Sequence, residues 1–297
     1  MRTNFQTMTL GAQMRLMDRS NAMERANARL ASGKNFTRPS EDPSGAAIAV
    51  ATRSELGSLD NYKAAGEDAT ARLQSTDTQL QAMQDRLTRL KELTVSASTG
   101  TSGPDQRAAI AQEVTSIRDD MVNIGNSKYL GQPLFAGFAS SDAVVYNAGT
   151  SSWQLTGQPT EKMLRSISDT DTVQVNVTST ELFAVGGSDL FTKLDQLAAD
   201  LNSGNASGIQ SAVSMVDQAK STVSTMQGRI GAAANRVDNM AQRIASQTVN
   251  AQSRLSNVED IDLAEGISEF QRQQAAYQAA LGATAKSIQQ SLVDWLR

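Results

Sequence analysis

The stretch IQSAVSMVDQAKSTVSTMQGRIGAAANRVDNMAQRI (residues 209–244) carries the longest regular pattern in this chain of 297 residues. An apolar residue, most often Ile or Val, recurs every seven residues, and a small or flexible residue follows three positions after five of these. β-Branched first positions opposite small second positions favour closely packed helices with a left-handed twist. The pattern therefore predicts one long helix that is buried along a single seam. The first positions are Ile209, Val216, Val223, Ile230, Val237, Ile244, Ala251 and Val258, and the second positions are Ala212, Ala219, Met226, Ala233 and Met240.

A second heptad pattern comes earlier in the chain, in a helix predicted over residues 44–98. Its positions alternate three and four apart, as in a coiled coil. A turn at residues 99–105 separates it from a third helix, which Pro104 is well placed to begin and Gly125 to end. Connections this short predict antiparallel neighbours. The seam positions are Leu73, Thr76, Leu80, Met83, Leu87, Leu90 and Thr94 in the second helix, Ile110, Val114, Ile117, Met121 and Ile124 in the third, and Leu190, Leu194 and Leu197 in a shorter helix that stops at residues 202–208.

Both ends of the chain are predicted to be amphipathic helices. The final helix begins after NVEDIDLAEG (residues 257–266), where Asp262 and Glu265 have the spacing of a capping box. Ordering the N-terminal arm (residues 1–38) costs more conformational free energy than its own apolar side chains can return, so we expect the arm to need the C-terminal helix and other subunits. The apolar positions are Phe5, Ala12, Leu16, Met23, Ala26 and Leu30 at the start, and Leu263, Ile267, Phe270, Tyr277, Leu281, Ile288, Leu292 and Trp295 at the end.

The period changes between Tyr129 and about residue 187, where glycines multiply and Val173, Val175 and Val177 alternate with polar residues. This pattern predicts short strands. The fold class is therefore mainly α, with long antiparallel heptad helices (a coiled-coil bundle) from both chain ends and a small β-rich insertion. We expect three domains: residues 1–40 with 259–297 as an inner coiled-coil domain, 41–138 with 188–258 as a helical core, and 139–187 as a β-rich outer domain.

The segment SGKNFTRPSEDP (residues 32–43) raises two alternatives, a phosphate-binding loop or a fixed corner between helices. A phosphate loop needs a glycine five residues before the Gly-Lys pair and a Ser or Thr after it. Ala28 and Asn35 stand at those positions. A corner fits better, because Pro43 suits the first position of a helix and Asp42 its N-cap.

The composition argues against enzymes and metal sites. The chain has no cysteine and no histidine, which removes the commonest zinc ligands, the usual general base and thiol or Ser-His nucleophiles. The formal charge is −4 with both signs mixed, so we expect protein partners, no nucleic acid and no membrane. Neither a run of about 18 apolar residues nor a continuous signal-peptide core is present. We expect no catalytic residue, no cofactor and no metal.

Two acidic segments contain carboxylates that could bind a cation. Three carboxylates, Glu259, Asp260 and Asp262, could supply oxygen ligands, but acidic residues are also favoured at the start of a helix, which is the preferred interpretation. The segment that begins at Asp169 and Asp171 resembles a calcium loop only at its first positions and is better interpreted as a strand.

Two stretches resemble the flagellin superfamily: ARLASGKNFTRPSEDPSGAAIA (residues 28–49) and SRLSNVEDIDLAEGISEFQRQQAAYQAALGATAKSIQQSLVDWLR (residues 253–297). GRIGAAANRVDNM (residues 228–240) is similar to its C-terminal core helix. Three features favour a hook–filament junction member over a filament flagellin: PSEDP (residues 39–43), KYLGQPLFAGF (residues 128–138) and SLVDWL (residues 291–296).

The resemblance implies a non-enzymatic, extracellular structural protein of the bacterial flagellum that joins hook to filament. It implies export without a cleaved signal peptide, through the flagellar type III apparatus and with an export chaperone. The implied partners are other copies of the chain, a neighbouring hook-associated protein on the hook side and flagellin on the filament side. The implied subunit-interface residues are Phe5, Leu16, Met23, Leu30, Phe270, Tyr277, Leu281, Ile288, Leu292 and Trp295, and the implied interdomain spoke consists of Lys34, Arg38, Pro39, Glu41, Asp42 and Pro43, whose charged members can pair with neighbouring subunits.

Two other functions remain open at this point. The chain could be a filament flagellin, or a soluble coiled-coil signalling module with the same heptads and few aromatic residues. A signalling module would need neither a β-rich insertion nor terminal helices that are too weak to fold alone.

Overall fold

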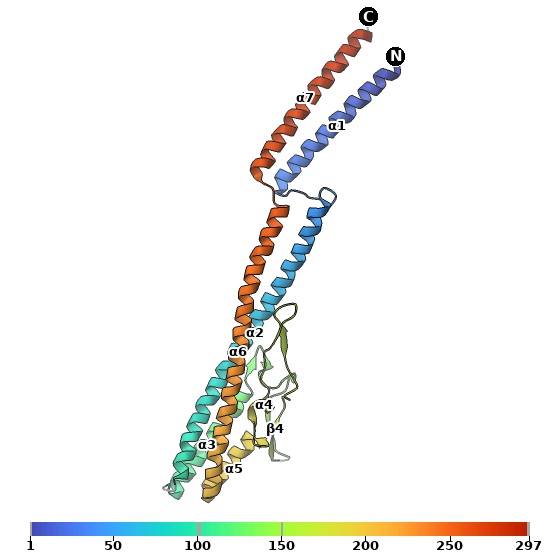
Figure 1. Cartoon of the computed structure of the whole chain (residues 1–297). Helices are drawn as coiled ribbons and strands as arrows, with labels where there is room; N and C mark the ends of the chain where they lie inside the picture. Colours follow the sequence, from blue (N-terminus) through green and yellow to red (C-terminus); the bar gives the residue numbers. More distant parts are fainter. Residues whose placement is uncertain (1, 100–101, 150, 296–297) are drawn as a thin grey trace. The chain divides into compact units, whose positions relative to one another are not determined.

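A computed structural model of the chain describes residues 2–99, 102–149 and 151–295, without the side chains of residues 2–6, 8–9 and 287–295 (Figure 1). The chain forms two compact units, one of Met1–Ser58 with Ser246–Arg297 and the other of Leu59–Ala245. The predicted fold class, mainly α with long helices and small strands, is confirmed.

The described residues of the first unit are helical apart from its two interhelical corners. Helix α1 (Arg2–Ser32) runs beside α7 (Leu263–Trp295), and the unit also holds the start of α2 (Pro43–Ser98) and the end of α6 (Ala206–Glu259) (Figure 1). A small apolar cluster of Phe36, Ala46 and Ala49 forms where α2 begins, with Leu255 and Val258 of α6 packed against it.

The second unit is organised around the predicted heptad seams. It contains the rest of α2 and α6 together with α3 (Pro104–Gly125) and α5 (Leu190–Ser203), and α3 packs against α5. Every predicted seam position of α2 is essentially buried, from Leu73 to Thr94. The first positions of α6 in this unit, from Ile209 to Ile244, are buried in the same way, so both heptad predictions are confirmed.

Within the described ranges the strands are short and form four separate antiparallel pairs. The predicted strand that carries Val173, Val175 and Val177 stops after Gln174, although all three valines are buried. Beyond that point the Val175 N–H makes one further backbone bond, to the Met163 carbonyl at 2.9 Å. The Asn176 side chain then replaces the backbone partners, because it accepts from the Met163 N–H at 2.9 Å and donates to the Glu161 carbonyl at 2.7 Å. The elements are β1 (Lys128–Tyr129) with β2 (Gln132–Pro133), β3 (Val144–Asn147) with β4 (Ser152–Leu155), β5 (Leu164–Ser166) with β6 (Thr172–Gln174), the short helix α4 (Ser179–Phe183), and β7 (Ala184–Val185) with β8 (Ser188–Asp189).

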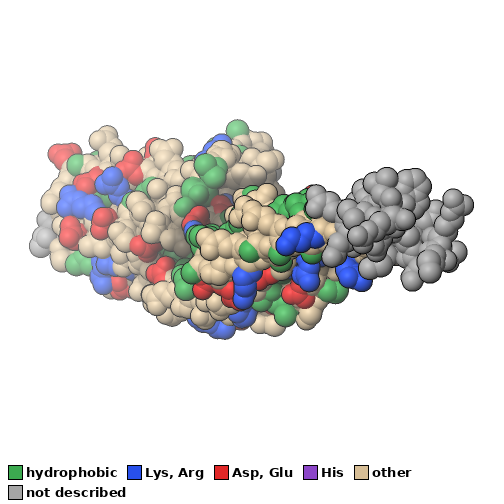
Figure 2. Space-filling model, turned by 90° about the horizontal axis from the view of Figure 1, so that it is seen from above, with side chains coloured by type: hydrophobic (Ala, Val, Ile, Leu, Met, Phe, Trp, Pro, Cys, Tyr) green, Lys and Arg blue, Asp and Glu red, His purple; other side chains and the backbone are tan. Residues whose placement is uncertain are grey.

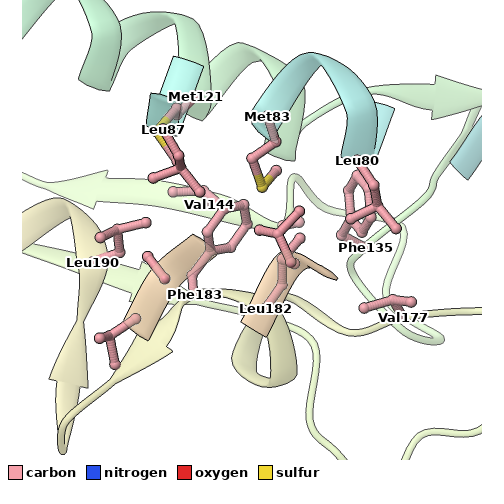
Figure 3. Close-up of a cluster of buried hydrophobic side chains, with 14 of the residues drawn as sticks. Leu80, Met83, Leu87, Met121, Phe135, Val144, Val177, Leu182, Phe183 and Leu190 are labelled. Atoms are coloured by element: carbon pink, nitrogen blue, oxygen red, sulfur yellow. The ribbon is translucent and has the colours of Figure 1, made fainter. Parts of the chain in front are cut away.

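The β-rich region shares its core with the helices. Figure 3 shows Leu182 and Phe183 of α4 beside Met83 and Leu87 of α2, and all four side chains belong to one buried cluster. The three-domain division stays a prediction, but residues 139–187 contribute to the hydrophobic core of the second unit.

Candidate functional site: the terminal helices and their corners

The predicted corner between α1 and α2 is present. Helix α1 ends at Ser32, and Gly33 follows with a left-handed φ of 69° that a side chain would disfavour. Pro43 occupies the first position of α2, and the Asp42 carboxylate accepts from the Gly45 backbone N–H at 2.9 Å. The N-cap prediction for Asp42 is therefore confirmed.

A second corner joins α6 to α7. Helix α6 ends at Glu259 and α7 begins at Leu263. The Asp262 carboxylate accepts from the backbone N–H groups of Ala264 at 2.8 Å and Glu265 at 3.3 Å, so Asp262 caps α7.

The two corners are hydrogen-bonded to each other. Lys34 and Asp260 form an antiparallel bridge, in which the Asn35 N–H donates to the Glu259 carbonyl at 2.7 Å and the Ile261 N–H donates to the Gly33 carbonyl at 3.0 Å. The Asn35 side chain adds a bond to the Asp260 carbonyl at 2.8 Å. Two segments that are far apart in sequence thus behave locally as a short pair of strands.

Glu259 lies at the centre of this contact, with a side chain that is only 8% exposed. The Lys34 ammonium and the Arg53 guanidinium both donate to the same carboxylate oxygen. The hydrogen bond from Lys34 and the positive charge of Arg53 lower the pKa of Glu259 below its usual value. This position corrects the sequence interpretation: Glu259 lies at the end of α6 and not at a helix start, and two cations compensate its charge.

The predicted spoke residues are largely engaged within the chain. Lys34 pairs with Glu259, and Asp42 caps α2. The Glu41 carboxylate accepts from the Thr37 N–H at 2.8 Å and from the Arg38 N–H at 3.4 Å. These backbone bonds, the one from Thr37 above all, lower the pKa of Glu41. The remaining spoke residues Arg38, Pro39 and Pro43 are exposed, and Arg38 lines a groove together with Arg25 and Arg29 of α1.

The predicted interface residues lie on the facing sides of α1 and α7 only in part. Leu16, Met23 and Leu30 of α1 are half-buried, as are Phe270 and Tyr277 of α7. Leu281 stays 42% exposed. The side chains of Phe5, Ile288, Leu292 and Trp295 lie outside the described residues, and the interface role of the whole set stays a prediction.

A second apolar face of the terminal helices has no cover within the described chain. On α1 it consists of Leu10, Met14 and Met17, which are 57%, 54% and 61% exposed. These spacings place all three on one side of a helix. On α7 the exposed apolar side chains are Leu263 and Ile267, in addition to Leu281. The predicted apolar stripe of α1 includes none of Leu10, Met14 and Met17, so the heptad pattern does not reveal this face.

The Asp42 cap leads to a first prediction. Replacing Asp42 by alanine removes the acceptor of the Gly45 N–H and should destabilise the start of α2 by about 1 kcal/mol. The expected result is about five-fold faster hydrogen exchange at the Gly45 amide. Asp42→Asn is the matched control, because asparagine caps about as well as aspartate. Equal exchange in the alanine variant and the wild type would contradict the capping role.

The face shown in Figure 2 carries Lys and Arg interspersed with Asp and Glu. Among the described residues no group of three or more Asp or Glu side chains is arranged to hold a metal ion. In the same part of the chain, no helix has the length and apolarity that a membrane span requires.

Paired heptad helices, capped corners and uncovered apolar faces characterise a helical structural protein that assembles with other chains. Residues 3–140 match the bacterial flagellin N-terminal helical region, and residues 213–296 match the bacterial flagellin C-terminal helical region. The two regions together span well over half of the sequence. The chain belongs to the bacterial flagellin family, as the resemblance predicted.

Individual relatives include both filament and junction proteins. The chain is 25% identical to a flagellin of Bacillus subtilis, over 98% of this chain and 97% of that one. It is 26% identical to the flagellar hook-associated protein 3 of Salmonella typhimurium, over 84% of this chain and 86% of the relative. The crystal structure of the flagellar junction protein FlgL from Legionella pneumophila matches the fold with a TM-score of 0.61 at 12% identity, over 72% of this chain and 100% of that one.

Proposed function

We propose that this chain joins the hook to the filament of the bacterial flagellum, as a structural protein that assembles through its terminal helices. The observation that carries the proposal is the uncovered apolar face of α1 and α7, in a chain of the flagellin family. An exposed apolar surface that follows a helix is typical of a protein interface. The family is one of structural flagellar proteins, and the absence of enzymatic activity in this chain is part of the proposal.

Several features support the junction over the filament. They are the PSEDP corner, the KYLGQPLFAGF segment and the terminal SLVDWL. A relative of similar length is named flagellar hook-associated protein 3. The filament flagellin alternative and the signalling alternative are not favoured.

The proposed assembly uses the terminal helices of neighbouring copies. Within one chain, the pairing of α1 with α7 leaves Leu10, Met14 and Met17 uncovered. Each large apolar side chain contributes about 1.5–3 kcal/mol when it becomes fully buried, and a ring of identical copies repeats that contribution around its axis. The proposal also includes charged contacts of an adjacent copy with Arg38, Arg25 and Arg29, which line one groove.

The proposed partners are other copies of the chain, a hook-associated protein on the hook side, flagellin on the filament side and a flagellar export chaperone. The proposed location is the outside of the cell, in the flagellum, after export without a cleaved signal peptide. The predicted inner domain, of residues 1–40 and 259–297, is the proposed assembly domain.

A gene deletion in the source bacterium tests the junction role. Cells without this chain should secrete flagellin into the medium but carry no filaments, because the first flagellin subunits have no surface on the hook to bind. The protein in the medium is identified by mass spectrometry, and expression of the wild-type chain should restore filaments. Loss of the flagellin itself from cells and medium would show instead that this chain is the filament subunit.

A triple variant tests the assembly face. In Leu10→Gln, Met14→Gln, Met17→Gln the exposed apolar side chains become polar, so the purified chain should melt within a few degrees of the wild type while the variant fails to restore filaments. Val145→Gln with Leu164→Gln is the control, because these side chains are 42% and 52% exposed outside the terminal helices. Normal filaments in cells that carry the triple variant would show that this face of α1 does not contribute to assembly.

A further inference from the structure

Glu259 differs from the other carboxylates of the first unit in its surroundings. Its side chain is 8% exposed, whereas Glu55, which pairs with Arg254 between the same two helices α2 and α6, is 45% exposed. Its two cationic partners come from different elements, Lys34 from the first corner and Arg53 from α2. One carboxylate therefore connects the end of α6 to both the corner and the helix that follows it.

The backbone reinforces the same contact. The carbonyl of Glu259 accepts the Asn35 N–H, and the N–H of Ile261 donates to the Gly33 carbonyl. These bonds hold the end of α1 next to the start of α7. Asn35 also reaches the Asp260 carbonyl with its side chain. Both terminal helices leave the rest of the first unit through this one contact.

We propose that Glu259 is a charge latch, which fastens the two interhelical corners together and so holds α1 and α7 as a single body before other copies bind. Release of the latch separates the corners and leaves the terminal helices joined through the packing of α1 against α7. The latch concerns the single chain and stands whether or not the chain occupies the hook–filament junction.

The energetics of burial explain why this carboxylate can act as a latch. A charge that has left water is stabilised only by its partners, and removing one partner leaves an uncompensated buried charge. An exposed pair such as Glu55 with Arg254 gains little, because water and salt screen it. Neutralising Glu259 therefore removes both cationic contacts at once, whereas neutralising Glu55 removes one weak contact.

The latch has a predictable response to acid. The hydrogen bond from Lys34 and the charge of Arg53 hold the pKa of Glu259 below its usual value of 4.5, and these are the charged groups of the corner and of α2 that act on it. A lowered pKa in the folded chain means that the stabilisation is fully present above pH 4.5 and is lost as the pH falls through the lower, folded value. The latch is therefore closed at neutral pH and opens in acid.

Hydrogen exchange at the amides of Asn35 and Ile261 measures the latch directly, because both amides donate across the two corners. In the full-length Glu259→Gln variant we expect exchange at these two amides to accelerate about ten-fold or more at pH 7, which corresponds to about 1.4 kcal/mol. The matched control, Glu55→Gln, should change the same amides less than about two-fold. Equal effects of the two variants, or unchanged exchange in Glu259→Gln, would overturn the proposal.

If the first unit of Glu259→Gln does not fold, two further measurements still test the proposal. They are hydrogen exchange of the wild type as a function of pH, and the same measurement on Lys34→Gln. Wild-type protection at Asn35 and Ile261, corrected for the intrinsic exchange rate, should persist above pH 4.5 and fall as the pH drops below that value. Lys34→Gln leaves Arg53 on Glu259, so its loss of protection should begin at a higher pH than in the wild type. A Lys34→Gln profile that superimposes on the wild-type profile would show that the charges do not fasten the corners.

Discussion

Substituting Val223 by aspartate is expected to lower the free energy of unfolding by about 3–5 kcal/mol. Val223 is a first position of the heptad seam of α6 and is 1% exposed. A carboxylate at this position leaves water without a cation to compensate it. Thermal or urea unfolding of the purified chain, followed by circular dichroism, measures the loss.

The pH dependence of this variant checks the cause. Burial raises the pKa of a carboxyl group, so the folded variant holds its proton more tightly than the unfolded chain does. Relative to the wild type, its stability should therefore be higher near pH 4 than near pH 8 and should fall as the pH rises. Ser224→Asp is the matched control, because Ser224 is the next residue of the same helix and is exposed. Equal stability of the two aspartate variants would mean that the seam is not buried in the isolated chain.

Removing the ring of Phe183 should cost about 3–5 kcal/mol of stability in Phe183→Ala. This side chain is fully buried, and its ring centroid lies 4.8 Å from that of Phe191 in α5. Figure 3 shows it among Leu87, Met121 and Val144, so the cavity would open between the β-rich region and the helices.

Phe138→Ala is the matched control for the same chemical change in the same region. Phe138 is 65% exposed, so its removal should change the free energy of unfolding by no more than about 0.5 kcal/mol. Urea unfolding of both variants provides the comparison. A loss below about 1 kcal/mol in Phe183→Ala would mean that the β-rich region folds apart from the helices.

The long helices and their ends could be predicted from sequence because their causes are local. A seven-residue repeat such as Ile209 to Ile244 selects one face of a helix wherever the partner lies. The break between α1 and α2 depends on residues such as Pro43, whose ring restricts its own backbone. The cap at Asp42 depends on a hydrogen bond to a residue only three positions away. These signals are contained in a few neighbouring positions.

The long-range polar contacts could not be predicted in that way. Glu259 lies 225 residues from Lys34, and no local pattern connects the two. Arg72 is a comparable case: it is buried, and its guanidinium donates to the Pro133 carbonyl at 3.3 Å. Burial lowers the pKa of Arg72, because it disfavours the charged guanidinium. No pattern of neighbouring residues predicts that this arginine is buried.

The β-rich region shows the intermediate case. The alternation of Val173, Val175 and Val177 predicts a strand, and all three side chains are buried although the strand covers only the first of them. The strand itself stops early because the side chain of Asn176 competes with the strand ladder. A hydrogen bond from one side chain to the backbone produces no repeating pattern in the sequence, so the end of this strand could not be predicted.

The pairing of the two corners also constrains the order in which this chain can fold. Residues 33–35 meet residues 259–261, so nearly the whole sequence must be available before the contact forms. Closing so long a loop is unfavourable until the chain between has collapsed. The contact between α3 and α5 and the hairpins of residues 128–189 join much closer segments and can form earlier. We therefore expect the second unit to act as the nucleus of folding, and the terminal helices to dock last.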